Sequence, residues 1–223
     1  MQNQSMLNLE IFEDVYQKLI LHFTSNTFKD ELSLAQKEFF DNTGTLDENK
    51  PNYTLRMSQF FDWYFLTRPL KGYMLSPLMV CEQQRELRLT DIDFAVIEVL
   101  KKHQHSIYEY IKTKNNEMHI KDLYKNEKII IVADQLVFSF DEKELFEARI
   151  VQIDKKNYYL KGFCFHPESA QKFIIEQTAI FRKNHDLNYN DFLVRLNKMR
   201  YKFEQYRHVK PEMIYTNENK LGL

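Results

Sequence analysis

Basic side chains near the C-terminus are the residues best suited to binding an anion. Arg195, Lys198 and Lys202 recur at i, i+3 and i+7, so a helix would present them on one face, with Arg200 beside it. Apolar residues at spacings of four and three over 192–206 predict that helix. Such a face can pair with the phosphates of a nucleic acid. The structural alternative is a solvent-exposed basic face that docks against acidic N-terminal helices.

Tyrosines in the predicted strands could add surfaces on which bases stack. In small β-barrels of the OB type, single-stranded bases stack on aromatic side chains. The tyrosines in question are Tyr108, Tyr110, Tyr158 and Tyr159. Together with the basic helix they define a nucleic-acid-binding hypothesis.

A metal site could be assembled from His103, His105, Cys164 and His166, with His119 nearby in the strands. The first two precede the first predicted strand, and Cys164 and His166 stand at i and i+2 on one strand face. Structural zinc usually takes four closely spaced Cys or His ligands, and that spacing does not occur here. We therefore expect no metal and no cofactor.

Motifs typical of enzymes are missing from the sequence. Its 4 glycines do not cluster, whereas phosphate-binding and dinucleotide-binding loops need several glycines together. There is no G-x-S-x-G elbow, and neither Cys81 nor Cys164 has the local surroundings of a nucleophile. We expect both thiols to be free and buried. An enzyme with distributed catalytic residues is thus the third function that we consider.

Composition predicts a folded chain without a membrane span. Hydrophobic residues make up 43% and aromatic residues 14% of the 223 residues, well above the range of disordered chains. The net charge of -1 excludes general polycation character. No stretch of about 18 apolar residues occurs, and the N-terminus lacks the pattern of a signal peptide. We therefore expect a cytoplasmic location, in a bacterium with an AT-rich genome.

The periodicity of apolar residues predicts an α+β fold in successive regions. Residues 1–104 form a helical region, and residues 105–166 form an antiparallel β module of five strands, either a meander or a small SH3-like or OB-like barrel. Residues 167–210 form two C-terminal helices packed on the β module. Pro211 is expected to stop the last helix, which leaves residues 211–223 as a mobile tail.

Local start and stop signals predict where the helices lie. The N-terminal helices are expected over 7–24, from Thr27 to 42, from Tyr53 to Thr67, over 76–87, and from the capping box of Thr90 and Asp93. The last helix is expected to begin at a cap formed by Asn188 or Asn190.

The run FFDWYFLTRPL, followed by the strand sequences up to LFEARIVQIDKKNYYLKGFCFHP, resembles a group of uncharacterised bacterial proteins. In that group a helix with an F-x-x-W-[FY] core precedes a small β module, and some members carry a C-terminal SEC-C metal-binding motif. Phe60, Trp63, Tyr64 and Arg68 hold the matching positions, whereas Thr67 stands where the group usually has an acidic residue. The Cys/His-rich motif is absent, so its metal does not carry over, and the resemblance implies no reaction.

Three polar residues at positions matching this group could have structural or functional roles. Arg68 follows the helix, where a guanidinium can bond the last carbonyls or bind a ligand anion. Asp122 and Arg149 could form a buried pair between strands.

We expect a non-catalytic, cytoplasmic interaction protein that binds another protein through its β module and aromatic surface. Nucleic-acid binding is the alternative, and an enzyme comes third. A protein partner is expected and nucleic acid is a possible partner, while the oligomeric state stays open.

Overall fold

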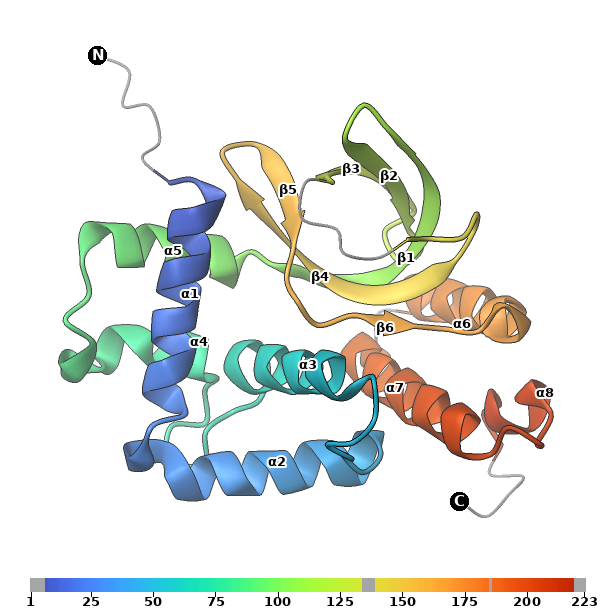
Figure 1. Cartoon of the computed structure of the whole chain (residues 1–223), viewed down its shortest axis with the longest axis horizontal. Helices are drawn as coiled ribbons and strands as arrows, with labels where there is room; N and C mark the ends of the chain where they lie inside the picture. Colours follow the sequence, from blue (N-terminus) through green and yellow to red (C-terminus); the bar gives the residue numbers. More distant parts are fainter. Residues whose placement is uncertain (1–6, 134–138, 185, 219–223) are drawn as a thin grey trace. The chain divides into compact units, whose positions relative to one another are not determined.

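The fold comes from a computed structural model that describes residues 7–133, 139–184 and 186–218 (Figure 1). It confirms the predicted α+β fold, with helices before and after a small barrel. The α-helices are α1 (Leu9–Phe23), α2 (Lys29–Thr43), α3 (Tyr53–Leu66), α4 (Pro77–Val80), α5 (Asp91–Lys101), α6 (Gln171–Lys183), α7 (Tyr189–Gln205) and α8 (Pro211–Ile214). The strands are β1 (Gln104–Lys114), β2 (Glu117–Asp122), β3 (Glu127–Val132), β4 (Leu145–Ile153), β5 (Lys156–Tyr159) and β6 (Cys164–Phe165).

Capping side chains begin α5 and α7 where the sequence predicted them, whereas the predicted start at Thr27 lies inside a 3-10 turn, Asn26–Phe28, that precedes α2. The Thr90 side chain accepts a hydrogen bond from the Asp93 backbone N–H, and the Asp93 carboxylate accepts one from the Thr90 N–H at 2.7 Å. This capping box satisfies two N–H groups that a helix start leaves without partners. Asn188 begins α7 by accepting from the N–H groups of Asn190 and Asp191.

The helix predicted over 76–87 is shorter than expected. α4 ends at Val80, and two 3-10 turns follow it. Gln84 has an extended backbone with ψ of 91°, and Arg88 is left-handed with φ of 44°. These two conformations interrupt the i to i−4 hydrogen bonds of an α-helix.

The strands form one sheet in the order β1-β2-β3-β5-β4-β6, and β1 also pairs with β4 to close the barrel. The pairings β1–β2, β2–β3, β4–β5 and β4–β6 are antiparallel, as predicted. The order is not that of a meander, because β5 follows β3 in the sheet. The last predicted strand is also divided, into β5 and β6. Small five-stranded barrels with a non-sequential strand order include the OB fold.

The chain divides into two compact units. The first contains residues 7–38, 48–104 and 149–162, and the second contains the remaining described residues. The core of the first unit is rich in aromatic rings from α1 and α3. Its fully buried members include Phe12, Leu19, Phe23, Phe60 and Phe65. None of the described helices is both long enough and apolar enough to cross a bilayer.

In the second unit, the C-terminal helices and the strands share a buried cluster. Strand residues Ile107 and Leu145 share one buried cluster with Ile174 of α6 and Leu196 of α7. The burial of these side chains from distant parts of the chain stabilises the unit.

The expectation of a mobile tail from 211 onwards needs correction. Pro211 begins α8, since the first position of a helix needs no N–H donor. Ile214 and Tyr215 are only 5% and 3% exposed, in the same cluster as α6 and α7. Residues 219–223 lie outside the described part of the chain.

Candidate nucleic-acid interface

The outer surface of β1, β2 and β3 carries lysines at regular positions. Alternation along the strands turns Met118, Ile120 and Ile131 inward, where each is at most 1% exposed. The residues between them face outward. We call this outer surface the lysine face, and its central residues are Lys112 and Lys114 of β1, His119 and Lys121 of β2, and Lys128 and Ile130 of β3.

The strand register fixes how these side chains meet. His119 lies between Lys112 on β1 and Ile130 on β3. Lys121 lies directly opposite Lys128. Like charges at directly opposed positions destabilise a sheet, so folding alone gives no reason for this pair of lysines.

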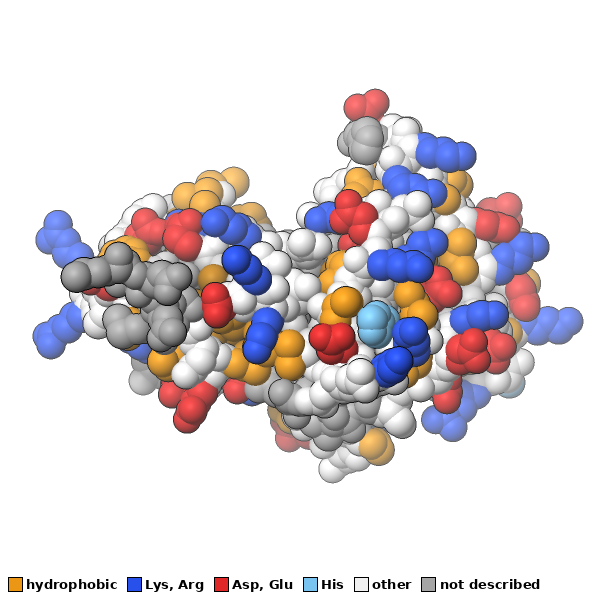
Figure 2. Space-filling view, turned by 90° about the horizontal axis from the view of Figure 1, so that it is seen from above, with side chains coloured by type: hydrophobic (Ala, Val, Ile, Leu, Met, Phe, Trp, Pro, Cys, Tyr) orange, Lys and Arg blue, Asp and Glu red, His pale blue; other side chains and the backbone are white. Residues whose placement is uncertain are grey.

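Acidic residues compensate the lysine face only in part. Glu109 lies opposite Lys121, and Glu117 lies opposite Lys114. The ion pairs formed among the described residues include none of the four lysines. On the face of the molecule drawn in Figure 2, Lys and Arg side chains are interspersed with Asp, Glu and hydrophobic side chains around a histidine.

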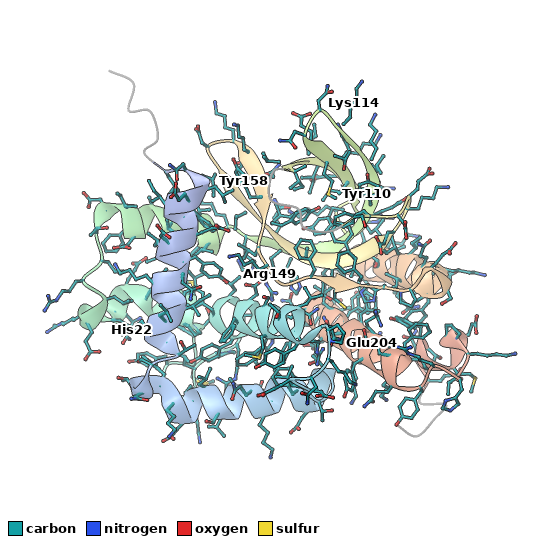
Figure 3. The ribbon with its side chains drawn as sticks, viewed as in Figure 1. His22, Tyr110, Lys114, Arg149, Tyr158 and Glu204 are labelled. Carbon is teal, nitrogen blue, oxygen red and sulfur yellow. The ribbon has the colours of Figure 1, made fainter. Side chains whose placement is uncertain are left out.

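The β1–β2 turn places one lysine at its edge. Lys114 is the last residue of β1 and is exposed at the tip of the hairpin (Figure 3). The turn residues Asn115 and Asn116 have φ of 52° and 63°. Two positive φ values are typical of a type I′ hairpin turn, a conformation that asparagine tolerates.

Arg195, Lys198 and Lys202, the residues of the predicted basic face, lie on α7 in the second unit. The Arg195 guanidinium lies 5.5 Å from the centre of the Phe192 ring. Burial lowers the pKa of Arg195. Burial lowers the pKa of Lys202, and the positive charge of the neighbouring Lys198 lowers it further. Neither shift involves a carboxylate, and the ion pairs of the described chain include none of these three residues.

Arg200 differs from the other basic residues of α7. Its Nε donates to the Phe165 carbonyl oxygen at 2.5 Å, and its Nη1 pairs with Glu204 at 2.9 Å. The first bond joins α7 to β6 and the second lies within α7, so we assign Arg200 a structural role.

The tyrosines do not form the predicted stacking surface. Tyr108 is 0% exposed and packs against Phe146, with ring centres 5.8 Å apart, so a base cannot reach it. Tyr110 stacks on Phe140 at 5.4 Å. Tyr108 faces inward, because it pairs with the buried Asp122. Tyr110 faces the same way, because residues two apart on a strand share a face.

The other two tyrosines lie on β5, in the first unit. Tyr158 is partly buried (Figure 3). Tyr159 is also partly buried, and burial raises the pKa of its hydroxyl. Neither lies in the lysine face.

Arg68 has a structural environment. It is 8% exposed, and its Nη1 and Nε donate to Glu31 at 2.5 Å and to Glu38 at 2.7 Å. These bonds join the end of α3 to α2, which leaves little of the guanidinium for a ligand.

Asp122 and Arg149 are both buried, and each has partners of its own. Asp122 Oδ1 accepts from the Ser106 hydroxyl at 2.8 Å and from two backbone N–H groups after β2. Arg149 Nη2 donates to the Thr67 hydroxyl at 3.0 Å. This hydrogen bond ties the end of α3 to β4.

The metal candidates have other partners. His103 Nδ1 lies 2.8 Å from the Leu100 carbonyl oxygen, and His105 Nε2 lies 2.7 Å from Glu147. Cys164 is buried, and His166 Nδ1 lies 3.4 Å from the Tyr215 hydroxyl. Within the described residues, no group of three or more His, Cys, Asp or Glu side chains could hold a metal ion.

The lysine face was not among the sites predicted from the sequence. A bulge at Ile111 shifts the register of β1, so that Tyr110 pairs with Ile120 while Lys112 pairs with His119. The sequence signal for this face was the spacing of two between Lys112 and Lys114, and between His119 and Lys121, since residues two apart on a strand share a face.

Comparisons with curated proteins and with solved structures gave no match. A family model described as a family of unknown function, DUF7986, matches residues 2–208. The match agrees with the expected resemblance to an uncharacterised family. Since it spans most of the chain, the protein belongs to this family of unknown function.

Proposed function

We propose that this protein binds single-stranded nucleic acid through the lysine face. The observation that carries the proposal is the set of four outward lysines on β1–β3, which lack ion-pair partners among the described residues and include the opposed pair Lys121 and Lys128. A phosphate between two opposed ammonium groups would relieve their repulsion.

The surface also contains groups that could contact bases. Ile130 is 47% exposed and lies beside His119. An imidazole next to an exposed aliphatic side chain offers a base a flat, partly apolar surface between the lysines. Single strands expose the base faces that such a surface needs, whereas a duplex keeps them stacked.

The fold supports the proposal by analogy only. In OB folds the face of the second and third strands binds oligonucleotides and oligosaccharides. Because one fold supports many functions, the lysines rather than the barrel carry the argument.

Protein binding through an aromatic β surface, the first expectation from the sequence, has less support. Tyr108 is buried and Tyr110 stacks on Phe140, so neither provides an exposed anchor. The outer surface of β1–β3 is charged, and lysine is depleted in protein interfaces.

The test is fluorescence polarisation with labelled 20-nucleotide RNA and DNA, single-stranded and duplex, at low salt. We expect single strands to bind, and the quadruple alanine variant of Lys112, Lys114, Lys121 and Lys128 to bind at least tenfold more weakly. The matched control replaces four exposed lysines of the first unit by alanine, namely Lys29, Lys37, Lys71 and Lys102. Absence of binding, or equal weakening by both variants, would reject the proposal.

A further inference from the structure

A pocket of about 190 Å³ lies within the first unit, apart from the lysine face. Its walls come from α1, α3 and the segment after β5, and they are mostly apolar. Side chains that form them include Phe12, Tyr16, Ile20, Phe61 and Leu160. A dry cavity of about 150 Å³ can hold benzene, so this pocket can hold a ring with one or two further atoms.

One buried carboxylate faces this apolar space. Asp62 lines the pocket although only 3% of it is exposed. Its Oδ1 accepts from the Tyr16 hydroxyl at 2.9 Å, and its Oδ2 accepts from the Gly162 N–H at 3.0 Å. Each oxygen of a carboxylate has about two lone pairs, so both oxygens retain capacity for another donor.

Gly162 permits the backbone to approach this carboxylate. A β-carbon at Gly162 would lie 2.6 Å from Asp62 Oδ2 and 3.1 Å from the Gln59 Cα. The local packing thus depends on a residue without a side chain, as is typical where backbone approaches closely.

The electrostatics of the pocket favour a ligand that donates a hydrogen bond. Burial raises the pKa of Asp62, with the nearby Arg149 acting against it. Burial likewise raises the pKa of the Tyr16 hydroxyl. A ligand hydrogen-bond donor that reaches Asp62 would replace part of the hydration that the carboxylate has lost through burial. At the rim, Glu13 and Lys161 lie 3.7 Å apart, so neither sign of charge dominates there.

We infer that this pocket binds a small apolar molecule whose single hydroxyl or amino group donates a hydrogen bond to Asp62. A carboxylate ligand would meet the Asp62 charge in an apolar space, which is unfavourable. A hydrocarbon of the same size would leave the remaining lone pairs of Asp62 without a donor. The inference does not depend on nucleic-acid binding, because all of these residues belong to the first unit.

The test is a titration of the full chain with benzyl alcohol, benzylamine, toluene and benzoate, followed by protein-observed NMR. We expect one or both donor ligands to bind with a Kd below about 1 mM, toluene to bind at least tenfold more weakly, and benzoate not to bind. Similar binding of benzyl alcohol and benzylamine would identify the hydrogen-bond donor as the recognised group. Tighter binding of benzylamine would identify its positive charge as the recognised feature. Binding of benzoate or toluene as tight as that of the donors would overturn the inference, as would absence of binding by all four.

Two variants connect binding to this pocket. Asp62→Asn keeps the shape, so we expect it to lose the preference for donors over toluene, whereas Asp14→Asn on the exposed side of α1 should keep it. If Asp62→Asn is unstable, Leu21→Trp serves instead, because Leu21 lines the pocket and is 59% exposed. A folded Leu21→Trp protein that binds the donors unchanged would place their site elsewhere and reject the inference.

Discussion

Gly44 and the ring of Tyr201 lie so close that a β-carbon on Gly44 would be 1.8 Å from a ring carbon. The Thr45 hydroxyl and the Tyr201 hydroxyl are also hydrogen-bonded, at 2.5 Å. The segment after α2 is therefore attached to α7 in the second unit through one ring.

We expect Gly44→Ala to destabilise the protein by about 2–4 kcal/mol, because the methyl group would overlap the ring and because φ at this position is +99°. Gly72→Ala is the matched control, since a β-carbon there has no neighbour within 4 Å. Its effect should stay within about 0.5 kcal/mol. Urea unfolding of both variants measures the difference, and equal stabilities would contradict the described packing.

Binding to the lysine face should depend steeply on salt. Each phosphate neutralised on a single strand contributes about −0.7 to the slope of log K against log salt concentration, so four lysines should contribute up to about −2.8. Polarisation titrations between 50 and 200 mM salt would measure the slope. Alanine at Lys121 and Lys128 should make it less steep by up to about 1.4, and an unchanged slope would show that these lysines do not contact phosphates.

The basic face of α7 can be separated from the lysine face by a triple variant. We expect alanine at Arg195, Lys198 and Lys202 to weaken nucleic-acid binding less than the quadruple lysine variant does. Arg200→Ala should instead lower stability by about 1–3 kcal/mol, because the Phe165 carbonyl and Glu204 would lose their partner. A larger loss of affinity in the triple variant would move the proposed interface to α7.

Stability should fall in acid because of His166. Burial lowers its pKa to about 4, well below the usual value of 6.5. Between these two values the unfolded chain binds a proton that the folded chain does not, so the contribution is present above pH 6.5 and is lost as the pH falls towards 4. The full loss corresponds to about 3 kcal/mol.

Urea unfolding between pH 4 and pH 7 would test this, with His166→Gln as the comparison. The variant lacks the titrating group, whereas every other group, including Asp62, is common to both proteins. The difference in stability between the two proteins should therefore change with pH in this window. A constant difference would mean that His166 takes up its proton without unfolding.

Local signals predicted much of the helical structure. The capping box at Thr90 and the cap at Asn188 depend on residues within three positions of each other, so the sequence was enough to place them. The shortened α4 was not predictable, because neither the 3-10 turn at Cys81–Gln83 nor the extended backbone of Gln84 is marked by a local signal such as glycine or proline.

The candidate sites depend on distant contacts, which explains why the sequence did not reveal them. Tyr16 and Asp62 are 46 residues apart, and Asp62 and Gly162 are 100 residues apart. The lysine face depends on a strand register that a single bulged residue resets. Alternation predicts that a strand has two faces but not which residues of its neighbours lie opposite.

The burial of Tyr215 places the end of the folding unit beyond residue 208. The family match stops at residue 208, whereas Ile214 and Tyr215 complete the cluster that covers Met199 of α7. A fragment cut at the family boundary would leave α7 with uncovered apolar side chains and a tendency to aggregate. The minimal folding unit is therefore longer than the segment by which its relatives are recognised.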